Sequence, residues 1–87
     1  MEPEFDLLHR EIVKEIAGTL GFTEKNAPTQ IDEQKASIVL GVRPATLCNW
    51  RTTGRHRLPY IKVGRLVRYR IADLAAWIAK RRTGMED

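Results

Sequence analysis

The 87-residue sequence contains one cysteine, Cys48, and no apolar run that approaches the roughly 18 residues of a membrane span. A single thiol cannot form an internal disulfide, so nothing indicates an oxidising compartment. The first residues, MEPEFDLLHREIV, carry acids where a signal peptide carries lysine or arginine. We therefore expect a cytoplasmic protein that is neither exported nor inserted in a membrane.

The residue sets that support catalysis or metal binding are also missing. The sequence shows no paired carboxylates, no Ser/His/Asp set and no glycine loop of the kind that cradles phosphate. No second thiol or histidine cluster accompanies Cys48, which argues against a zinc site. We expect a protein that is not an enzyme and holds neither a cofactor nor a metal.

Acidic residues are absent from one long stretch. Between Gly41 and Arg70 there are eight basic residues and no acid. Residues 1–37 hold four basic and eight acidic residues, a net charge of −4, whereas residues 38–87 hold eleven basic and three acidic residues, a net charge of +8. Because solvated surfaces usually mix both signs, this stretch suggests a polyanionic partner, with nucleic acid first and an anionic membrane second.

What is present fits one small folded domain, since 43% of residues are hydrophobic and 30% charged. Apolar residues recur at spacings of three and four near the N-terminus, at Phe5, Leu8, Ile12, Ile16 and Leu20. This spacing predicts an amphipathic helix over residues 5–18, ended by Gly18 and Gly21. The polar segment of residues 23–29, which contains Pro28, is expected to be a linker.

Two short helices are predicted next. Asp32 suits the N-cap of a helix over residues 33–40, and Gly41 suits its end. Pro44 is tolerated in the first turn of a second helix that continues through residues 45–51. Two helices joined by a tight turn that contains glycine are typical of a helix-turn-helix.

The segment IKVGRLVRYR, residues 61–70, alternates apolar and basic residues around Gly64 and Arg65. Period-2 alternation predicts a half-buried hairpin with these two residues as its loop, and the glycine suits the positive φ of a type II′ turn. Ile61 and Val63 are expected to face one way and Lys62 the other. After the turn, the inward side chains are expected to be Val67 and Tyr69, and the outward ones Leu66, Arg68 and Arg70. A final helix is predicted over residues 72–82.

The run IDEQKASIVLGVRPATLCNWR…LPYIKVGRLVRYRIADLAAWI, residues 31–79, closely resembles the excisionase-like helix-turn-helix family of phages and mobile elements, which also includes AlpA-type regulators. The elements GVxPxTLxxW and LPYIKVGRxVRYRxxDLxAWI carry this resemblance together. It implies an α+β fold, a small MerR-like winged helix-turn-helix with a two-stranded hairpin wing and a C-terminal helix. In that family the second helix enters the major groove, and the wing reaches an adjacent minor groove or its phosphates.

The chain departs from the family pattern in four places. Arg43 stands where a serine cap is common, Ala72 replaces a polar cap before Asp73, and the loop GRHR before Leu58 is longer and adds two arginines. The first 28 residues have no counterpart in the pattern. We therefore expect an N-terminal helix and linker over 1–28, a DNA-binding domain over 29–83 and a tail over 84–87.

The resemblance implies a nucleoid-associated protein that binds double-stranded DNA and helps an integrase in excision. An AlpA-type transcriptional regulator remains an alternative, and so does a protein-interaction adaptor that uses the N-terminal helix. A recombinase and further copies of the chain on DNA are its expected protein partners. The cysteine triplet and long coiled coil of a MerR-type sensor are absent, so no small-molecule ligand is implied.

On the second helix, Ala45, Thr46 and Asn49 lie on or near one face, and threonine and asparagine are residue types that read base edges. Arg43 and Arg51, at the helix ends, are predicted to hold phosphates. The cations predicted to contact DNA from the loop and the wing are Arg55, Arg57, Lys62, Arg65, Arg68 and Arg70. Among these, the arginine at the hairpin tip is the one expected to enter a narrow minor groove.

Other polar and aromatic residues favour structural interpretations. His9 is expected at the surface and His56 as an ordinary loop histidine. The two tryptophans and two tyrosines are expected to face the core rather than to stack on bases, namely Trp50, Tyr60, Tyr69 and Trp77. The apolar stripe of the N-terminal helix either covers the winged core or binds a partner.

Overall fold

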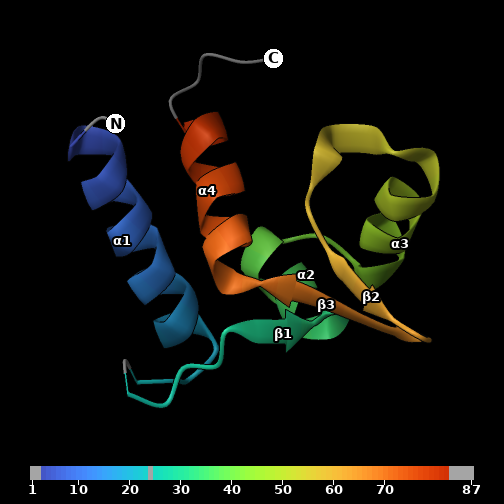
Figure 1. Cartoon of the computed structure of the whole chain (residues 1–87), viewed down its shortest axis with the longest axis horizontal. Helices are drawn as coiled ribbons and strands as arrows, with labels where there is room; N and C mark the ends of the chain where they lie inside the picture. The colour runs from blue at the N-terminus through green and yellow to red at the C-terminus, as the bar shows by residue number, and fades with distance from the viewer. Residues whose placement is uncertain (1–2, 24, 83–87) are drawn as a thin grey trace.

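The computed structural model describes residues 3–23 and 25–82 (Figure 1). The predicted tail, 84–87, lies outside these residues. The elements in chain order are α1 (Pro3–Thr19), β1 (Gln30–Asp32), α2 (Glu33–Leu40), α3 (Pro44–Thr53), the 3₁₀ turn η1 (Arg55–Arg57), β2 (Ile61–Val63), β3 (Leu66–Arg70) and α4 (Ile71–Arg82). This small α+β fold, with four helices and an antiparallel sheet, confirms the predicted class and is consistent with a winged helix-turn-helix.

Helix α1 uses its apolar stripe to pack against α4. Ile12, Ile16 and Ala17 are buried there, and the two helices run side by side in Figure 1. Of the two alternatives for the stripe, covering the core is therefore the one observed. The helix continues through Gly18, contrary to prediction, and ends before Gly21, whose φ of 84° is left-handed. A hydrogen bond from the Phe22 N–H to the Ala17 carbonyl, 2.8 Å long, closes this end.

The sequence predicted both ends of α2. Asp32 accepts a hydrogen bond from the Lys35 backbone N–H at 2.8 Å, which satisfies one of the free donors of the first turn. Gly41 takes the left-handed conformation, and its N–H returns to the last turn of the helix.

Helix α3 begins at Pro44 as predicted but extends to Thr53, two residues beyond the predicted end. Thr52 and Thr53 donate their hydroxyls to the carbonyls of Cys48 and Asn49, so these polar residues stay within the helical hydrogen-bond pattern. Gly54, with φ of 73°, ends the helix.

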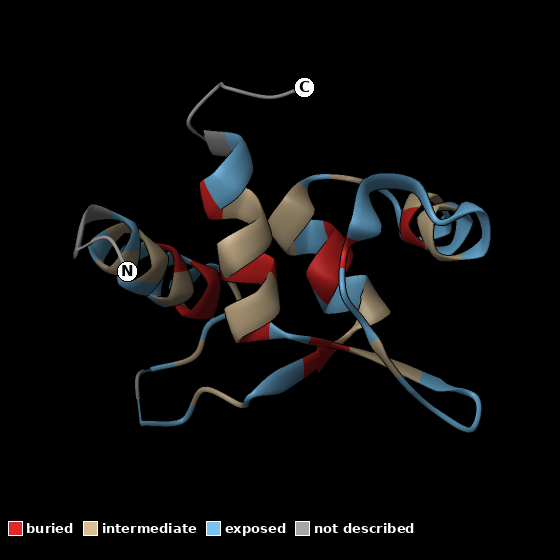
Figure 2. Ribbon diagram, turned by 45° about the horizontal axis from the view of Figure 1, so that its top comes forward, coloured by how far each residue is buried: buried red, intermediate tan, exposed pale blue. Residues whose placement is uncertain are grey.

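The sheet has three strands in the order β1-β3-β2, so the predicted two-stranded wing gains a third strand. The hairpin of β2 and β3 has the predicted two-residue loop, because Val63 pairs with Leu66, and Gly64 has the expected positive φ of 61°. Strand β1 lies in the part of the chain next to the predicted linker and pairs antiparallel with β3, Ile31 opposite Tyr69. Figure 2 shows the helices on one side of this sheet.

Strand β3 leads directly into α4, which begins at Ile71. Ala72 is therefore inside the first turn, not at the cap position that the family pattern suggested. The Ala72 carbonyl lies 2.9 Å from Nε2 of His9, so His9 joins α1 to the start of α4, and the prediction of a simple surface histidine was wrong. The core between these elements is centred on fully buried side chains, namely Leu47, Tyr69 and Leu74.

Candidate nucleic-acid interface

The exposed stripe of α3 consists of Ala45, Cys48, Asn49 and Thr52, whereas Leu47 on the opposite face is fully buried. These four positions follow the i, i+3, i+4 and i+7 spacing of one helix face. Ala45 and Asn49 therefore lie together as predicted, but Thr46 is half-buried beside the stripe. The sequence analysis did not assign Cys48 and Thr52 to this stripe, although their spacing of three and seven residues from Ala45 could have identified both.

Arg43 precedes α3 and is exposed. Its backbone is extended and its side chain makes no capping hydrogen bond. Pro44 has no N–H, and the Thr46 N–H donates to the Arg43 carbonyl at 2.9 Å, which leaves the Ala45 N–H in this turn. The positive end of the helix dipole and the guanidinium place two sources of positive potential at one point. The arrangement suits a phosphate oxygen at the start of α3.

Arg51 faces the interior of the molecule rather than an external phosphate. Its Nε and Nη2 lie 3.2 Å from the two carboxylate oxygens of Glu33, and Nη2 lies 3.0 Å from Oε2. The side chains of this pair are 18% and 23% exposed. The structure therefore argues against the predicted phosphate contact at Arg51, because its donors already hold a carboxylate that sequence reasoning had not paired with it.

Tyr69 completes this cluster by donating its hydroxyl to Oε2 of Glu33 at 3.0 Å. Burial is the main cause that raises the pKa of Tyr69 far above its ordinary value, and the hydrogen bond to Glu33 adds to it, so the phenol stays protonated. The cluster joins the first turn of α2 to α3 and β3. It fixes the helix-turn-helix against the base of the wing.

The loop after α3 has an unusual backbone. Gly54, His56 and Arg57 have φ values of 73°, 65° and 49°. Left-handed backbone is costly for residues other than glycine and persists where surrounding contacts enforce it. Several contacts hold the middle residue of η1, His56, in place.

His56 supplies those contacts and is not the ordinary loop residue that was predicted. Its ring lies against Trp50 with centroids 4.4 Å apart. Its carbonyl accepts hydrogen bonds from Nε1 of Trp77 at 2.8 Å and Nη2 of Arg81 at 3.3 Å, while the Arg81 guanidinium lies 3.8 Å from the Trp77 ring centroid. The loop is thus joined to α4, and Arg55 and Arg57 project from a fixed backbone.

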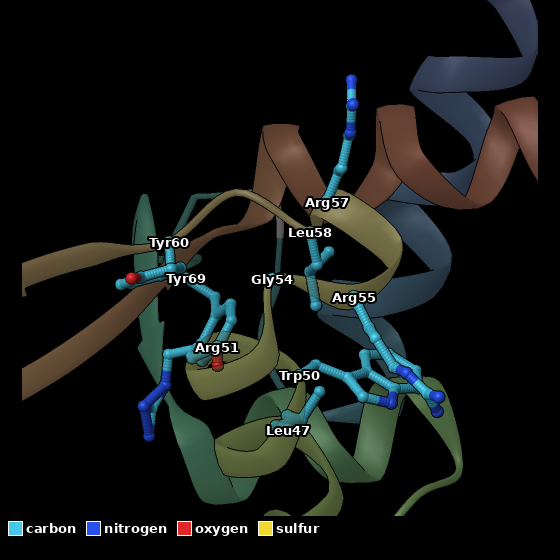
Figure 3. Close-up of a pocket in the computed structure, with 9 residues that line it drawn as sticks. All are labelled: Leu47, Trp50, Arg51, Gly54, Arg55, Arg57, Leu58, Tyr60 and Tyr69. Atoms are coloured by element: carbon cyan, nitrogen blue, oxygen red, sulfur yellow. The ribbon is translucent and has the colours of Figure 1, made fainter.

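Figure 3 shows the space that α3, this loop and the base of the wing enclose, a cavity of about 160 Å³. Arg57 points away from the cavity in this view, and Arg51 and Arg55 lie on different sides of it. Tyr60 also lines the cavity but is 44% exposed, so the prediction that its ring faces the core was wrong. Tyr69 is buried as predicted, and Trp50 is half-buried. The cavity lining contains no acidic residue.

The wing does not carry all its cations on one face. Residues directly opposite each other in a sheet share a face, and the register pairs Lys62 with Val67 and Ile61 with Arg68. Lys62 is therefore on the helix side of the sheet, whereas Arg68 and Arg70 are on the uncovered side. The cations of the wing are therefore divided between two faces, because alternation within a strand does not say which phase its partner takes.

The wing cations also differ in how free they are. Arg65 is exposed at the two-residue turn, and Lys62 and Arg70 are exposed along the strands. Arg68 is half-buried, donates to the Val67 carbonyl at 3.2 Å, and lies opposite Asp32 in the register. Arg68 is therefore the most restrained of the four.

Six of the predicted cations are exposed and pair with no carboxylate among the side chains that the structure describes: Arg43, Arg55, Arg57, Lys62, Arg65 and Arg70. They belong to α3, the loop and the wing. Figures 1 and 2 both place these elements on the side of α4 opposite to α1, which carries much of the acidic charge. The molecule therefore presents an unneutralised positive region at one end.

No helix in residues 3–23 and 25–82 is long and apolar enough to cross a membrane. The same part of the chain contains no group of three or more histidine, cysteine or acidic residues placed to hold a metal ion.

Comparison with known proteins gave one match. A family model described as a helix-turn-helix domain matches residues 34–82, which is more than half of the chain. No curated protein and no solved structure gave a significant match.

Proposed function

Because the chain belongs to the helix-turn-helix domain family of excisionase-like and AlpA-like proteins, we propose that it is a sequence-specific architectural DNA-binding protein, an excisionase that helps an integrase. DNA is the partner of this family, which is typically non-enzymatic. The observation that carries the proposal is the positive region of α3, the loop and the wing, whose six cations have no carboxylate partner among the described side chains.

Helix α3 would enter the major groove with its exposed stripe toward the bases. Asn49, central in that stripe, has the amide geometry to bond both N6 and N7 of adenine. Ala45 offers a methyl group to thymine, and Thr46 lies at the margin of the contact. Arg43 would hold the phosphate at the start of the helix, which sets the register of the reading residues.

The loop and the wing would supply contacts that do not depend on sequence. Arg55 and Arg57 extend the positive region beyond the end of α3, and Arg65 suits entry into a narrow minor groove. Lys62, in the hairpin, suits a phosphate beside that groove, whereas Arg70, at the end of β3 opposite Gln30, lies farther from the tip and suits the backbone that flanks it. Arg68 is expected to contribute less, because it is half-buried.

Fluorescence anisotropy with duplex DNA at several salt concentrations tests the proposal. Six phosphate contacts would give a slope of log K against log salt of about −5. Arg10→Ala, which removes an exposed cation from α1, is a control that should leave the slope unchanged. Binding without salt dependence, or the same slope loss for Arg10→Ala as for Arg65→Ala, would contradict the proposed surface.

Excision and transcriptional regulation need different tests, since both use the same helix and wing. An excision assay in cells that lack this chain should show loss of excision, restored by the wild-type chain and not by Asn49→Ala. Unchanged excision with altered transcription would favour the AlpA-like role. An adaptor role is less well supported, because the apolar stripe of α1 that it would use is buried against α4.

A further inference from the structure

The tip of the wing carries an apolar pair that nothing in the described structure covers. Val63 and Leu66 are the last cross-strand pair before the turn, and they are 64% and 55% exposed. Because they lie directly opposite each other, their side chains share the uncovered face of the sheet, with Ile61 behind them. Two large apolar side chains at the extremity of a hairpin add nothing to the core, and their burial would favour a bound state.

The surroundings of this pair select an anionic partner. Arg65 is between the two residues in the chain, Lys62 precedes them, and Arg68 and Arg70 follow on the same face as Leu66. The sequence from Gly41 to Arg70 contains no acid. A symmetric contact between two copies at this point would bring identical arginine tips together, which like-charge repulsion opposes.

We propose that Val63 and Leu66 form an apolar wedge that enters the minor groove beside Arg65 and bends the duplex. This inference rests on the proposed function and adds a bending role to it. The minor groove of regular DNA is only about 6 Å wide, so two branched side chains in addition to an arginine would have to widen it. Widening by an apolar wedge that partly unstacks a base step bends DNA toward the major groove.

The wedge and the cations act through different forces, and this separates their effects. Loss of a phosphate contact lowers the salt slope, because fewer counterions are released. Loss of an apolar contact weakens binding without changing that slope, because no charge is removed. The bend should depend on the apolar pair, since it follows from the volume inserted between the groove walls.

The test uses the full chain with Val63→Thr and Leu66→Thr, which keep branched side chains suited to strands. Leu7→Thr is the matched control, because Leu7 is 61% exposed on α1, a helix that lies far from the wing in Figure 1. Affinity, salt slope and DNA bend are measured together, the bend by energy transfer between dyes on the duplex ends. Thermal unfolding of each variant checks the fold, and the two single variants replace the double variant if its midpoint falls.

The wedge predicts about tenfold weaker binding for the double variant, a smaller bend and an unchanged salt slope, with none of these effects in Leu7→Thr. Wild-type affinity and bend in the double variant would overturn the wedge while leaving the proposed function intact. A wild-type dimer that the double variant converts to a monomer would also overturn it, and would assign the pair to a second copy. Absence of duplex binding by the wild type would overturn the proposed function and the wedge together.

Discussion

The two ends of this molecule use their exposed and buried surface in opposite ways. At one end, α1 buries its apolar stripe against α4, and His9 adds a hydrogen bond between the two helices. At the other end, α3, the loop and the wing present cations with no described carboxylate partner and an apolar pair with no described cover. The first end uses most of its apolar surface to hold two helices together, whereas the second leaves charge and an apolar pair exposed on one surface.

Two arginines at the ends of α3 show the same contrast at the scale of single residues. Arg51 is held by Glu33 through a bidentate ion pair, whereas Arg43 has no such partner among the described residues. Their residue type and their helix are the same. A basic residue at the end of a binding helix stabilises the fold when a carboxylate of the fold lies within reach. When none does, the same residue type is left exposed and can contact a ligand.

The largest effect on stability is expected at the α1–α4 contact, which distinguishes the buried end of the molecule from the exposed one. Ile16→Ala should lower the free energy of unfolding by about 3 kcal/mol, because a large buried side chain leaves a cavity. Urea denaturation measures this, and Leu7→Ala, at an exposed position of the same helix, should change stability by less than about 0.5 kcal/mol. Equal effects of the two variants would mean that α1 is an appendage and not part of the core.

The next largest effect should come from Arg51→Ala. Removing the guanidinium leaves the poorly solvated Glu33 carboxylate without its countercharge and with only the Tyr69 hydroxyl as a donor among the described side chains, so we expect a loss of about 2 kcal/mol in unfolding free energy. The slope of log K against log salt for DNA should stay as in the wild type. Arg55→Ala is the matched control, with the opposite pattern of unchanged stability and a reduced slope; a reduced slope in Arg51→Ala would show that Arg51 does reach DNA.

Asn49→Ala sharpens the comparison within the binding end. Loss of a bidentate contact to adenine should weaken binding to the preferred site by about 1.5 kcal/mol. Binding to unrelated duplexes should be unchanged, since the phosphate contacts remain. Competition binding with DNA selected from random fragments measures the ratio of affinities for the preferred site and for unrelated duplexes. An equal loss of affinity on all sequences would show that Asn49 does not contact the bases specifically.

The smallest change is expected from Arg65→Ala. Removing this cation from the minor groove should reduce the size of the salt slope by up to about 0.9, because fewer counterions are displaced. Stability should stay unchanged, because the side chain makes no hydrogen bond or ion pair with the described residues. Anisotropy titrations over a range of salt concentrations measure it. Should the variant lose specificity with an unchanged slope, this arginine reads shape or sequence and does not neutralise a phosphate.

Local signals in the sequence predicted the elements whose ends depend on neighbouring residues. Asp32 and Gly41 define α2, and the two residues Gly64 and Arg65 define the hairpin, because caps and tight turns are made by residues adjacent in the chain. Strand β1 could not be found in this way. It is only three residues long and exists through its pairing with β3, about 40 residues later.

The same contrast between local signals and contacts of distant residues explains which parts of the candidate site could be predicted. Positions on α3 followed from helical spacing, but the partner of Arg51 is 18 residues away, and the contact of His9 is 63 residues away. The sequence could not show which residues of the two wing strands share a face, for a related reason. Alternation gives the phase within one strand, and only the register across the hairpin decides that Val63 shares a face with Leu66.

The position of Glu33 has a practical consequence for transplanting this module. The family match starts at Gln34, so a fragment cut at that boundary would leave behind strand β1, the Asp32 cap and the only carboxylate that holds Arg51 in the described structure. Arg51 would then join the other free cations on the surface. Such a fragment should bind any duplex more strongly than the intact chain and discriminate less among sequences. The reason is that an added positive charge strengthens electrostatic attraction to the phosphates, which does not depend on the base sequence.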